Sequence, residues 1–89
     1  MTAVFQIIFK RSAQKDIRRI PQSILQFIYE HIEALATNPL PPGVKPVSGY
    51  DNYYRIRIGQ YRVIYELSTS IRIIFIARVG HRKDIYKHF

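Results

Sequence analysis

The chain has 89 residues, a length that suits one small domain spanning residues 1–89 and excludes separate cofactor and substrate domains. Its hydrophobic content of 47% is typical of a folded chain, and the absence of cysteine excludes disulfides, thiolate metal sites and cysteine nucleophiles. The net charge is +8, and residues 45–89 hold nine of the 14 basic residues but three of the six acidic ones, so we expect an anionic partner.

The first half of the chain predicts a strand followed by two helices. Residues 4–9 are apolar and β-branched, with Gln6 as the one interruption, which indicates a short strand. Ser12 can cap a helix that runs to residue 20, and Pro21 suits the first turn of a second helix. His31 lies in this second helix and is expected to be exposed. The helix also carries an apolar stripe expected to face the core and to have no chemical role: Ile24, Ile28, Ile32 and Leu35, widened by Leu25, Phe27 and Tyr29.

A proline-rich loop separates the helices from a run of strands. The loop holds Pro39, Pro41, Pro42, Gly43 and Pro46. Residues 52–58 and 61–67 then alternate in hydrophobicity around Gly59-Gln60, which suits a two-residue type II′ hairpin turn. Residues 71–79 are apolar on both faces, as is typical of a central strand, and Gly80 is expected to end it. Residues 83–89 are expected to form a last helical turn or no regular structure.

The same pattern indicates the fold class and the location. The order β-α-α-β-β-β predicts an α+β fold in which a two-helix hairpin packs on one face of a small, mainly antiparallel sheet. No apolar run is long enough to cross a bilayer, and residues 1–9 lack the basic start and the cleavage site of a signal peptide. The expected location is the cytoplasm.

A two-residue turn fixes the register of the predicted hairpin. The face under the helices then consists of three cross-strand pairs: Ile58 with Tyr61, Ile56 with Val63, and Tyr54 with Tyr65. The other face pairs Arg57 with Arg62, Arg55 with Ile64, and Tyr53 with Glu66. Two arginines directly opposite each other destabilise a sheet unless an anion lies between them. This favours a phosphate ligand over a solvated face on which the side chains splay apart.

A polar segment follows the last strand. His81, Arg82 and Lys83 come directly after Gly80, and Tyr86 lies one helical turn further on. A histidine can exchange a proton near neutral pH, although a lone histidine is more often an ordinary surface residue. The three histidines are far apart in the sequence and the six carboxylates form no ligand set, so no metal is expected. Two kinds of function remain: metal-free chemistry on a phosphodiester, and binding without chemistry.

Two segments together resemble the RelE branch of the RelE/ParE toxin superfamily: residues 54–66 (YRIRIGQYRVIYE) and residues 79–86 (VGHRKDIY). The resemblance covers essentially the whole chain, including the two-helix hairpin and the proline-rich loop. It implies the toxin of a type II toxin–antitoxin system, which cleaves mRNA in the A site of the 70S ribosome by metal-free attack of the ribose 2′-OH, without a cofactor. It also implies a RelB-like acidic antitoxin as partner, operator DNA contacted only through the antitoxin complex, and no membrane.

The resemblance further implies roles for individual residues. Arg57 and Arg62 would stabilise the charge that develops on the phosphorane, and Arg82 would neutralise or protonate the leaving 5′-oxygen. Tyr86 would stack on or orient the nucleotide, and His81, at a position where RelE has Lys, is the preferred proton-transfer group. The expected RNA- and phosphate-binding residues are Arg55, Arg57, Lys45 and Lys83. RelE tends to have Lys at the positions of Arg55 and Arg57, and because Arg is very hard to deprotonate, neither is expected to accept a proton.

Two alternatives stay open. A ParE-like protein would share the fold but poison DNA gyrase without cleaving nucleic acid, and it would not need Arg62, Arg82 and Tyr86 together. A plain RNA-binding module would need an aromatic platform on consecutive strands, which this sequence lacks. The sequence therefore favours the mRNA endoribonuclease.

Overall fold

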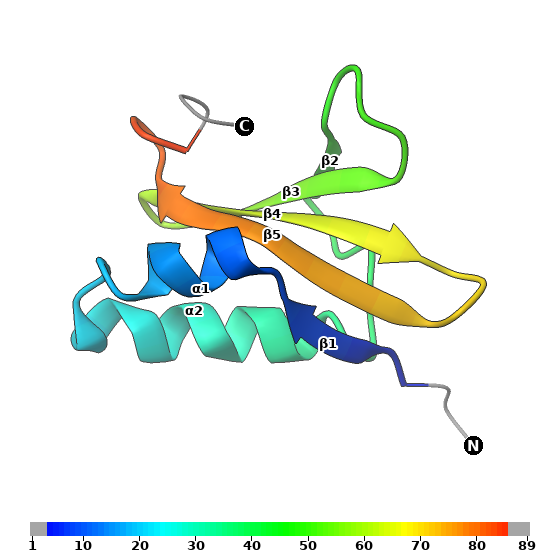
Figure 1. Cartoon of the computed structure of the whole chain (residues 1–89), viewed down its shortest axis with the longest axis horizontal. Coiled ribbons are helices and arrows are strands. Elements are labelled where there is room, and N and C mark those ends of the chain that lie inside the picture. The colour runs from blue at the N-terminus through cyan, green and yellow to red at the C-terminus, as the bar shows by residue number, and fades with distance from the viewer. Residues whose placement is uncertain (1–3, 86–89) are drawn as a thin grey trace.

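Five strands form one sheet in the computed structural model, which describes residues 4–85 (Figure 1). The strands are β1 (Gln6–Phe9), β2 (Lys45–Pro46), β3 (Tyr53–Ile58), β4 (Tyr61–Ser68) and β5 (Ile73–His81). Their order across the sheet is β1-β5-β4-β3-β2, with β1 parallel to β5 and the other neighbours antiparallel. The predicted α+β fold is confirmed, and β5 lies inside the sheet as its two apolar faces indicated.

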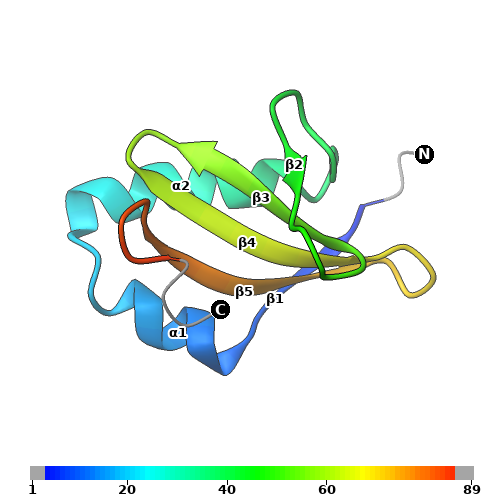
Figure 2. The same cartoon turned by 90° about the horizontal axis from the view of Figure 1, so that it is seen from above.

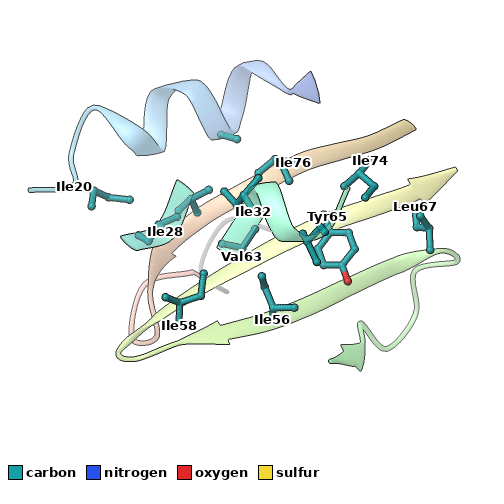
Figure 3. Packing of buried hydrophobic residues seen from close by; sticks show 13 residues of the cluster. Ile20, Ile28, Ile32, Ile56, Ile58, Val63, Tyr65, Leu67, Ile74 and Ile76 are labelled. Atoms are coloured by element: carbon teal, nitrogen blue, oxygen red, sulfur yellow. The ribbon is translucent and has the colours of Figure 1, made fainter. Parts of the chain in front are cut away.

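The helices α1 (Arg11–Ile17) and α2 (Gln22–Ala34) lie on one side of the sheet, as predicted (Figures 1 and 2). They carry the chain from β1 at one edge of the sheet to β2 at the other edge, and β3, β4 and β5 then return toward β1, which β5 joins in parallel. The core between helices and sheet is built from aliphatic residues and one tyrosine (Figure 3): Ala13, Ile20, Ile28, Ile32, Leu35, Ile56, Ile58, Val63, Tyr65, Leu67, Ile74, Ile76 and Val79. Neither helix within residues 4–85 is long and apolar enough to span a membrane.

The apolar stripe of α2 is narrower than the sequence indicated. Ile28 and Ile32 are fully buried, whereas Phe27 is 59% exposed and Tyr29 is 37% exposed. Successive residues of an α-helix turn by about 100°, so the two aromatic residues lie beside the stripe and not within it. The expectation that Phe27 and Tyr29 extend the core-facing stripe is therefore wrong.

Helix α1 covers the part of β5 that β1 is too short to reach. β1 pairs with β5 only as far as Ile76, whose carbonyl oxygen accepts the backbone N–H of Lys10 at 2.9 Å. Beyond that point the Ser12 hydroxyl donates to the Ala77 carbonyl oxygen at 2.6 Å, and the Val79 N–H donates to Asp16 Oδ2 at 3.0 Å. Ser12 is thus inside the helix, and Lys10 occupies the N-cap position. The predicted cap is wrong because the Ser12 hydroxyl donates to a carbonyl oxygen at the edge of β5 instead.

Several boundaries differ from the predictions. β1 is shorter than residues 4–9, and β5 is shifted toward the C-terminus because Gly80 and His81 still pair with β4. Gly80 therefore does not end the strand. The proline-rich loop also contains β2, which pairs with Arg55 and Tyr54 of β3, so the order is β-α-α-β-β-β-β. Proline is tolerated in β2 because it is an edge strand.

Candidate functional site

The hairpin of β3 and β4 has the predicted register. Gly59 adopts a φ of 59°, the positive value that a type II′ turn requires at its first central residue. Ile58 pairs with Tyr61 and Arg57 pairs with Arg62 directly across the two strands. The turn chemistry of one glycine therefore places two guanidinium-bearing residues opposite each other at one end of the sheet.

The hairpin turn itself holds the Arg62 side chain. Its Nη1 donates to the carbonyl oxygens of Gly59 at 3.1 Å and of Tyr61 at 2.9 Å. The guanidinium is a planar group with five N–H donors, so anchoring one of its nitrogens orients the others. The position of this cation is thus set by the backbone of the turn.

The end of β5 reaches the same hairpin. Gly80 pairs with Arg62, His81 pairs with Tyr61, and the N–H of Arg82 donates to the Gln60 carbonyl oxygen at 2.8 Å. The residues predicted to be catalytic at positions 57, 62, 81 and 82 therefore come together at one end of the sheet. Tyr86 lies outside the described residues.

The His81 ring is held by two contacts. It packs edge-on against Tyr61, with ring centroids 5.6 Å apart, and its Nδ1 lies 3.2 Å from the backbone N–H of Lys83. A backbone amide can only donate, so Nδ1 accepts and a neutral His81 ring carries its proton on Nε2. The lone pair with which a neutral His81 would take up a proton is thus engaged in this hydrogen bond.

A turn of residues 81–85 folds back on the face of the sheet opposite the helices. The N–H groups of Asp84 and Ile85 donate to the His81 carbonyl oxygen at 2.9 and 3.0 Å. Ile85 is 1% exposed and packs in a second, small core with Ile64 and Ala77. This anchor fixes the segment that carries His81, Arg82 and Lys83.

A groove of about 560 Å³ runs between the C-terminal part of α2, the proline-rich loop and β3. It is lined by His31, Ala34, Leu35, Asn38, Pro41, Pro42, Gly43, Lys45, Arg55, Ile56, Arg57 and Arg62. Four of these residues are cationic and none is acidic, and we call this feature the cationic groove. Lys45, Arg55 and Arg57, three of the four predicted phosphate-binding residues, therefore line one surface, whereas Lys83 is exposed in the turn after β5.

One wall of the cationic groove is fixed to the core. The hydroxyl of the buried Tyr65 donates to the Pro39 carbonyl oxygen at 2.6 Å, which holds the start of the proline-rich loop. Burial, with a smaller contribution from the nearby Tyr54, raises the pKa of Tyr65 far above its usual range, so the hydroxyl remains a donor. Because proline restricts the backbone, the loop forms a stiff wall.

His81 does not line the cationic groove. It lines a second hollow of about 370 Å³ together with Asp16, Arg19, Ile20, Tyr61, Arg78, Val79, Gly80, Asp84 and Ile85. Two carboxylates and two guanidiniums balance here, and we call this feature the charge-balanced pocket. Asp16 accepts from Arg78 Nε at 2.8 Å and from Nη2 at 3.1 Å, and this hydrogen bonding, against the opposing effect of burial, raises the pKa of Arg78.

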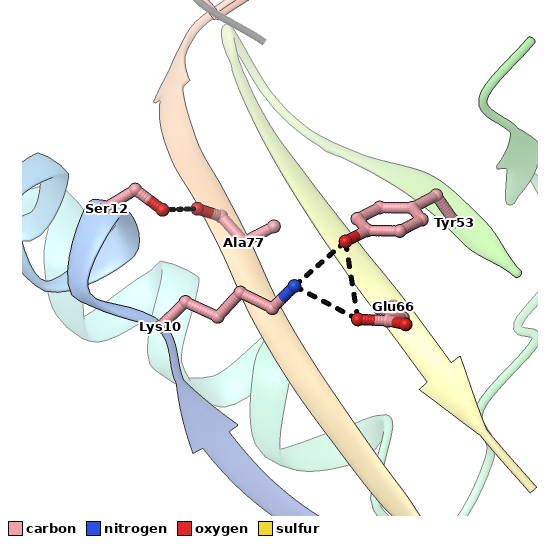
Figure 4. A network of polar contacts seen from close by, with 5 residues as sticks. All are labelled: Lys10, Ser12, Tyr53, Glu66 and Ala77. Carbon is pink, nitrogen blue, oxygen red and sulfur yellow. Dashed lines mark hydrogen bonds and ion pairs between the residues drawn. The ribbon is translucent and has the colours of Figure 1, made fainter. Parts of the chain in front are cut away.

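Sequence reasoning missed a polar network on the face opposite the helices (Figure 4). Lys10 Nζ donates to the Tyr53 hydroxyl at 2.8 Å and to Glu66 Oε1 at 3.0 Å, and the Tyr53 hydroxyl donates to the same carboxylate at 3.3 Å. The cross-strand pairing of Tyr53 with Glu66 could be predicted from the hairpin register. Nothing in the local sequence indicates that Lys10 reaches them.

Comparison with known proteins identifies the family of this chain. The family described as ParE toxin of type II toxin-antitoxin system, parDE, matches residues 7–86. Toxin RelE3 of Methanocaldococcus jannaschii is 36% identical over 88 residues, which cover 94% of this chain and 98% of that protein. The chain therefore belongs to the ParE toxin family of type II toxin–antitoxin systems and is a toxin of the RelE type, as the resemblance implied.

Solved structures of relatives have the same fold. The archaeal RelE–RelB complex from Pyrococcus horikoshii matches with a TM-score of 0.77 at 25% identity, covering 94% of this chain and 99% of that chain. The RelB–RelE antitoxin–toxin complex from Methanococcus jannaschii matches with a TM-score of 0.66 at 35% identity, covering 92% of this chain and 98% of that chain. The overlap extends over nearly the full length of each solved toxin.

Proposed function

We propose that this toxin is a ribosome-dependent endoribonuclease that acts in the cytoplasm and cleaves mRNA in the ribosomal A site. The observation that carries the proposal is the meeting of Arg57, Arg62 and Arg82 at the end of one hairpin, where the turn itself orients Arg62. Fixed guanidiniums suit the pentavalent phosphorane that forms during RNA cleavage, because they carry charge and hydrogen-bond donors to its oxygens.

The proposed reaction is an internal transesterification. The ribose 2′-OH attacks the adjacent phosphorus, the bond from phosphorus to the 5′-oxygen breaks, and the products are a 2′,3′-cyclic phosphate and a 5′-OH. Arg57 and Arg62 stabilise the added negative charge, and Arg82 neutralises the leaving oxygen. In this proposal Tyr86 orients the nucleotide, and no protein nucleophile or metal is needed.

Proton transfer in this proposal involves His81. Because its Nδ1 accepts the Lys83 N–H, the ring must release that hydrogen bond before it can accept the proton of the 2′-OH there. A rotation of the His81 side chain when the ribosome presents the RNA would release it. Such a requirement gives a physical reason for dependence on the ribosome, which also orients the 2′-OH.

A RelB-like acidic antitoxin is the proposed partner in the resting cell, because relatives of this toxin have been solved as complexes with RelB. The net charge of +8 complements an acidic chain. Operator DNA is then contacted only through the antitoxin complex. The association rate of toxin and antitoxin should fall as salt rises, and a rate that is unchanged between low and high salt would point to an apolar interface.

The proposed chemistry can be tested on the RNA. Primer extension on mRNA translated in the presence of the toxin should reveal new 5′ ends inside codons. Replacing the ribose at the cut position by deoxyribose should block cleavage while binding persists, and the upstream fragment should end in a cyclic phosphate or 3′-phosphate. Cleavage of the deoxy-substituted codon, or a free 3′-OH on that fragment, would contradict this mechanism.

The match to the ParE toxin family keeps one alternative from the sequence analysis open, a ParE-like toxin that inhibits DNA gyrase. The two targets leave different traces in the same cells. Induction should produce mRNA cut within codons if the RelE-type function holds. Intact mRNA together with accumulating gyrase–DNA breaks would move this protein to the ParE-type function.

A further inference from the structure

We infer that the cationic groove binds a nucleotide next to the scissile linkage, with a second phosphate between Lys45 and Arg55 and the base against the end of α2. The inference rests on the proposed action on RNA and extends it to a subsite outside the reacting bond. The groove joins two kinds of surface, a cationic strand pair on one side and an uncharged, largely apolar shelf on the other.

The charges of the groove come as two pairs of like sign. Arg57 is opposite Arg62 in the β3–β4 register, and Lys45 is opposite Arg55 in the β2–β3 register. Neighbouring cationic side chains on one face of a sheet suit a phosphate that lies between them. Arg55 and Arg57 lie on the same face of β3 and are about 7 Å apart along the strand, and their partners lie on the neighbouring strands to either side. Two such positions in a row suit two successive phosphates of one extended strand.

The wall opposite these cations suits a nucleobase. Ala34 and Leu35 at the end of α2 and the prolines of the stiff loop supply apolar surface, and Asn38 supplies both a hydrogen-bond donor and an acceptor. Proteins recognise unpaired RNA bases by stacking and by hydrogen bonds to their edges. The volume of about 560 Å³ lies within the range of about 300–1,000 Å³ typical of ligand sites.

His31 gives the groove a second polar group of fixed orientation. Its ring stacks on Phe27 with centroids 5.5 Å apart, and its Nδ1 lies 3.0 Å from the Phe27 carbonyl oxygen. A carbonyl can only accept, so Nδ1 carries a proton and the neutral ring has its acceptor at Nε2. The exposed Phe27, which contributes nothing to the core, thus has a role in orienting a groove residue.

A single-stranded RNA fits these features better than an acidic peptide does. An acidic peptide would satisfy the four cations but has no planar group to match the shelf and Asn38. The charge-balanced pocket, whose lining includes Asp16 and Asp84, offers no comparable surface for an anion. We therefore assign the groove to RNA and treat peptide binding as an outcome of the test.

The test uses two uncleavable probes, a 2′-O-methyl RNA dinucleotide with one phosphodiester and a trinucleotide with two. Titration of the full-length toxin should shift the NMR signals of the Asn38 side-chain amide and the Ala34 and Gly43 backbone amides. Lys45→Glu should weaken trinucleotide binding about tenfold and lower its salt dependence by about 0.7 in log–log slope, while dinucleotide binding changes less than about twofold. Asn38→Ala should change the preference among bases with the salt slope unchanged.

The matched control is Lys15→Glu, the same charge change on the exposed face of α1 and outside the groove. Equal weakening by Lys15→Glu and Lys45→Glu, no shift at Asn38, or equal shifts with an acidic peptide would overturn the inference. Cleavage of translated mRNA is measured separately on the wild-type toxin. If cleavage is absent while the binding pattern holds, the nuclease function fails and the subsite stands. If cleavage occurs while the binding pattern is absent, the subsite alone is overturned.

Discussion

The cationic groove and the charge-balanced pocket use adjacent residues of β4, Arg62 and Tyr61, yet they differ in the balance of the charges that line them. In the pocket, Asp16 holds Arg78 through two hydrogen bonds and also accepts a backbone N–H of β5. Among residues 4–85, those lining the groove include four cations and no carboxylate. The ion pair in the charge-balanced pocket stabilises the fold. The excess of positive charge along the cationic groove suits an anionic ligand.

The largest expected effect concerns the charge-balanced pocket. Asp16→Ala leaves the Arg78 guanidinium, 17% exposed, without its carboxylate and removes the acceptor of the Val79 N–H. Breaking a largely buried ion pair in this way costs about 3–5 kcal/mol, so we expect a loss of that size in the free energy of urea unfolding. Glu66→Ala, which removes an ion pair that is about one-third exposed, should cost about 1 kcal/mol or less. Equal losses in the two variants would contradict the distinction.

The next largest effect is expected on activity, from two variants that should keep the fold intact. Arg62→Ala and Arg82→Ala should each lower the rate of mRNA cleavage about 10²–10³-fold, because each removes a positioned charge from the transition state. The urea midpoint of both variants should stay close to that of the wild type, in contrast to Asp16→Ala. Lys15→Ala serves as the control for total charge. Full toxicity of both arginine variants at equal expression would show that the site lies elsewhere.

The hairpin could be predicted from the sequence because its information is local. A two-residue turn with Gly59 at its first position leaves one alignment of the alternating strands, and that alignment places Arg57 opposite Arg62. The helix order and the central place of β5 follow in the same way from periodicity and from apolarity on both faces. These are patterns that a few neighbouring residues carry by themselves.

The rest of the site depends on contacts between distant segments. Asp16 and Arg78 are 62 positions apart, and Lys10 and Glu66 are 56 apart, so no local pattern pairs them. His31 looks like an ordinary exposed helix residue until α2 packs beside β3 and places it in the groove with Arg55. Ser12 has the chemistry of a helix cap, but the uncovered edge of β5 uses its hydroxyl instead.

A smaller effect is expected where the core holds the wall of the groove. Tyr65→Phe removes the donor to the Pro39 carbonyl oxygen and should cost about 1 kcal/mol of unfolding free energy. Because the folded state raises the pKa of this phenol, its contribution is present below about pH 10 and is lost as the pH rises further. Between pH 7 and pH 11, the urea midpoint should therefore fall less for Tyr65→Phe than for the wild type. The same fall in both would contradict the role of Tyr65.

The smallest effect is expected at the Lys10 network, whose ion pair is about one-third exposed. Burial, the largest single influence, lowers the pKa of Lys10, but hydrogen bonds and charge interactions with Tyr53 and Glu66 together raise it above 10.5. A raised pKa means that the network stabilises the fold below that pH and ceases to do so as the pH rises through the folded value.

Lys10→Met should therefore cost about 1 kcal/mol or less at pH 7, and the difference from the wild type should shrink at high pH. The comparison is with Lys15→Met, which removes an exposed lysine of α1. Urea unfolding of the three proteins between pH 7 and pH 11.5 measures the difference. A loss as large as that of Asp16→Ala would mean that this network, like the charge-balanced pocket, is part of what holds the sheet together. The division between a structural pocket and partly exposed surface pairs would then have to be redrawn, because exposure would no longer predict which charges the fold depends on.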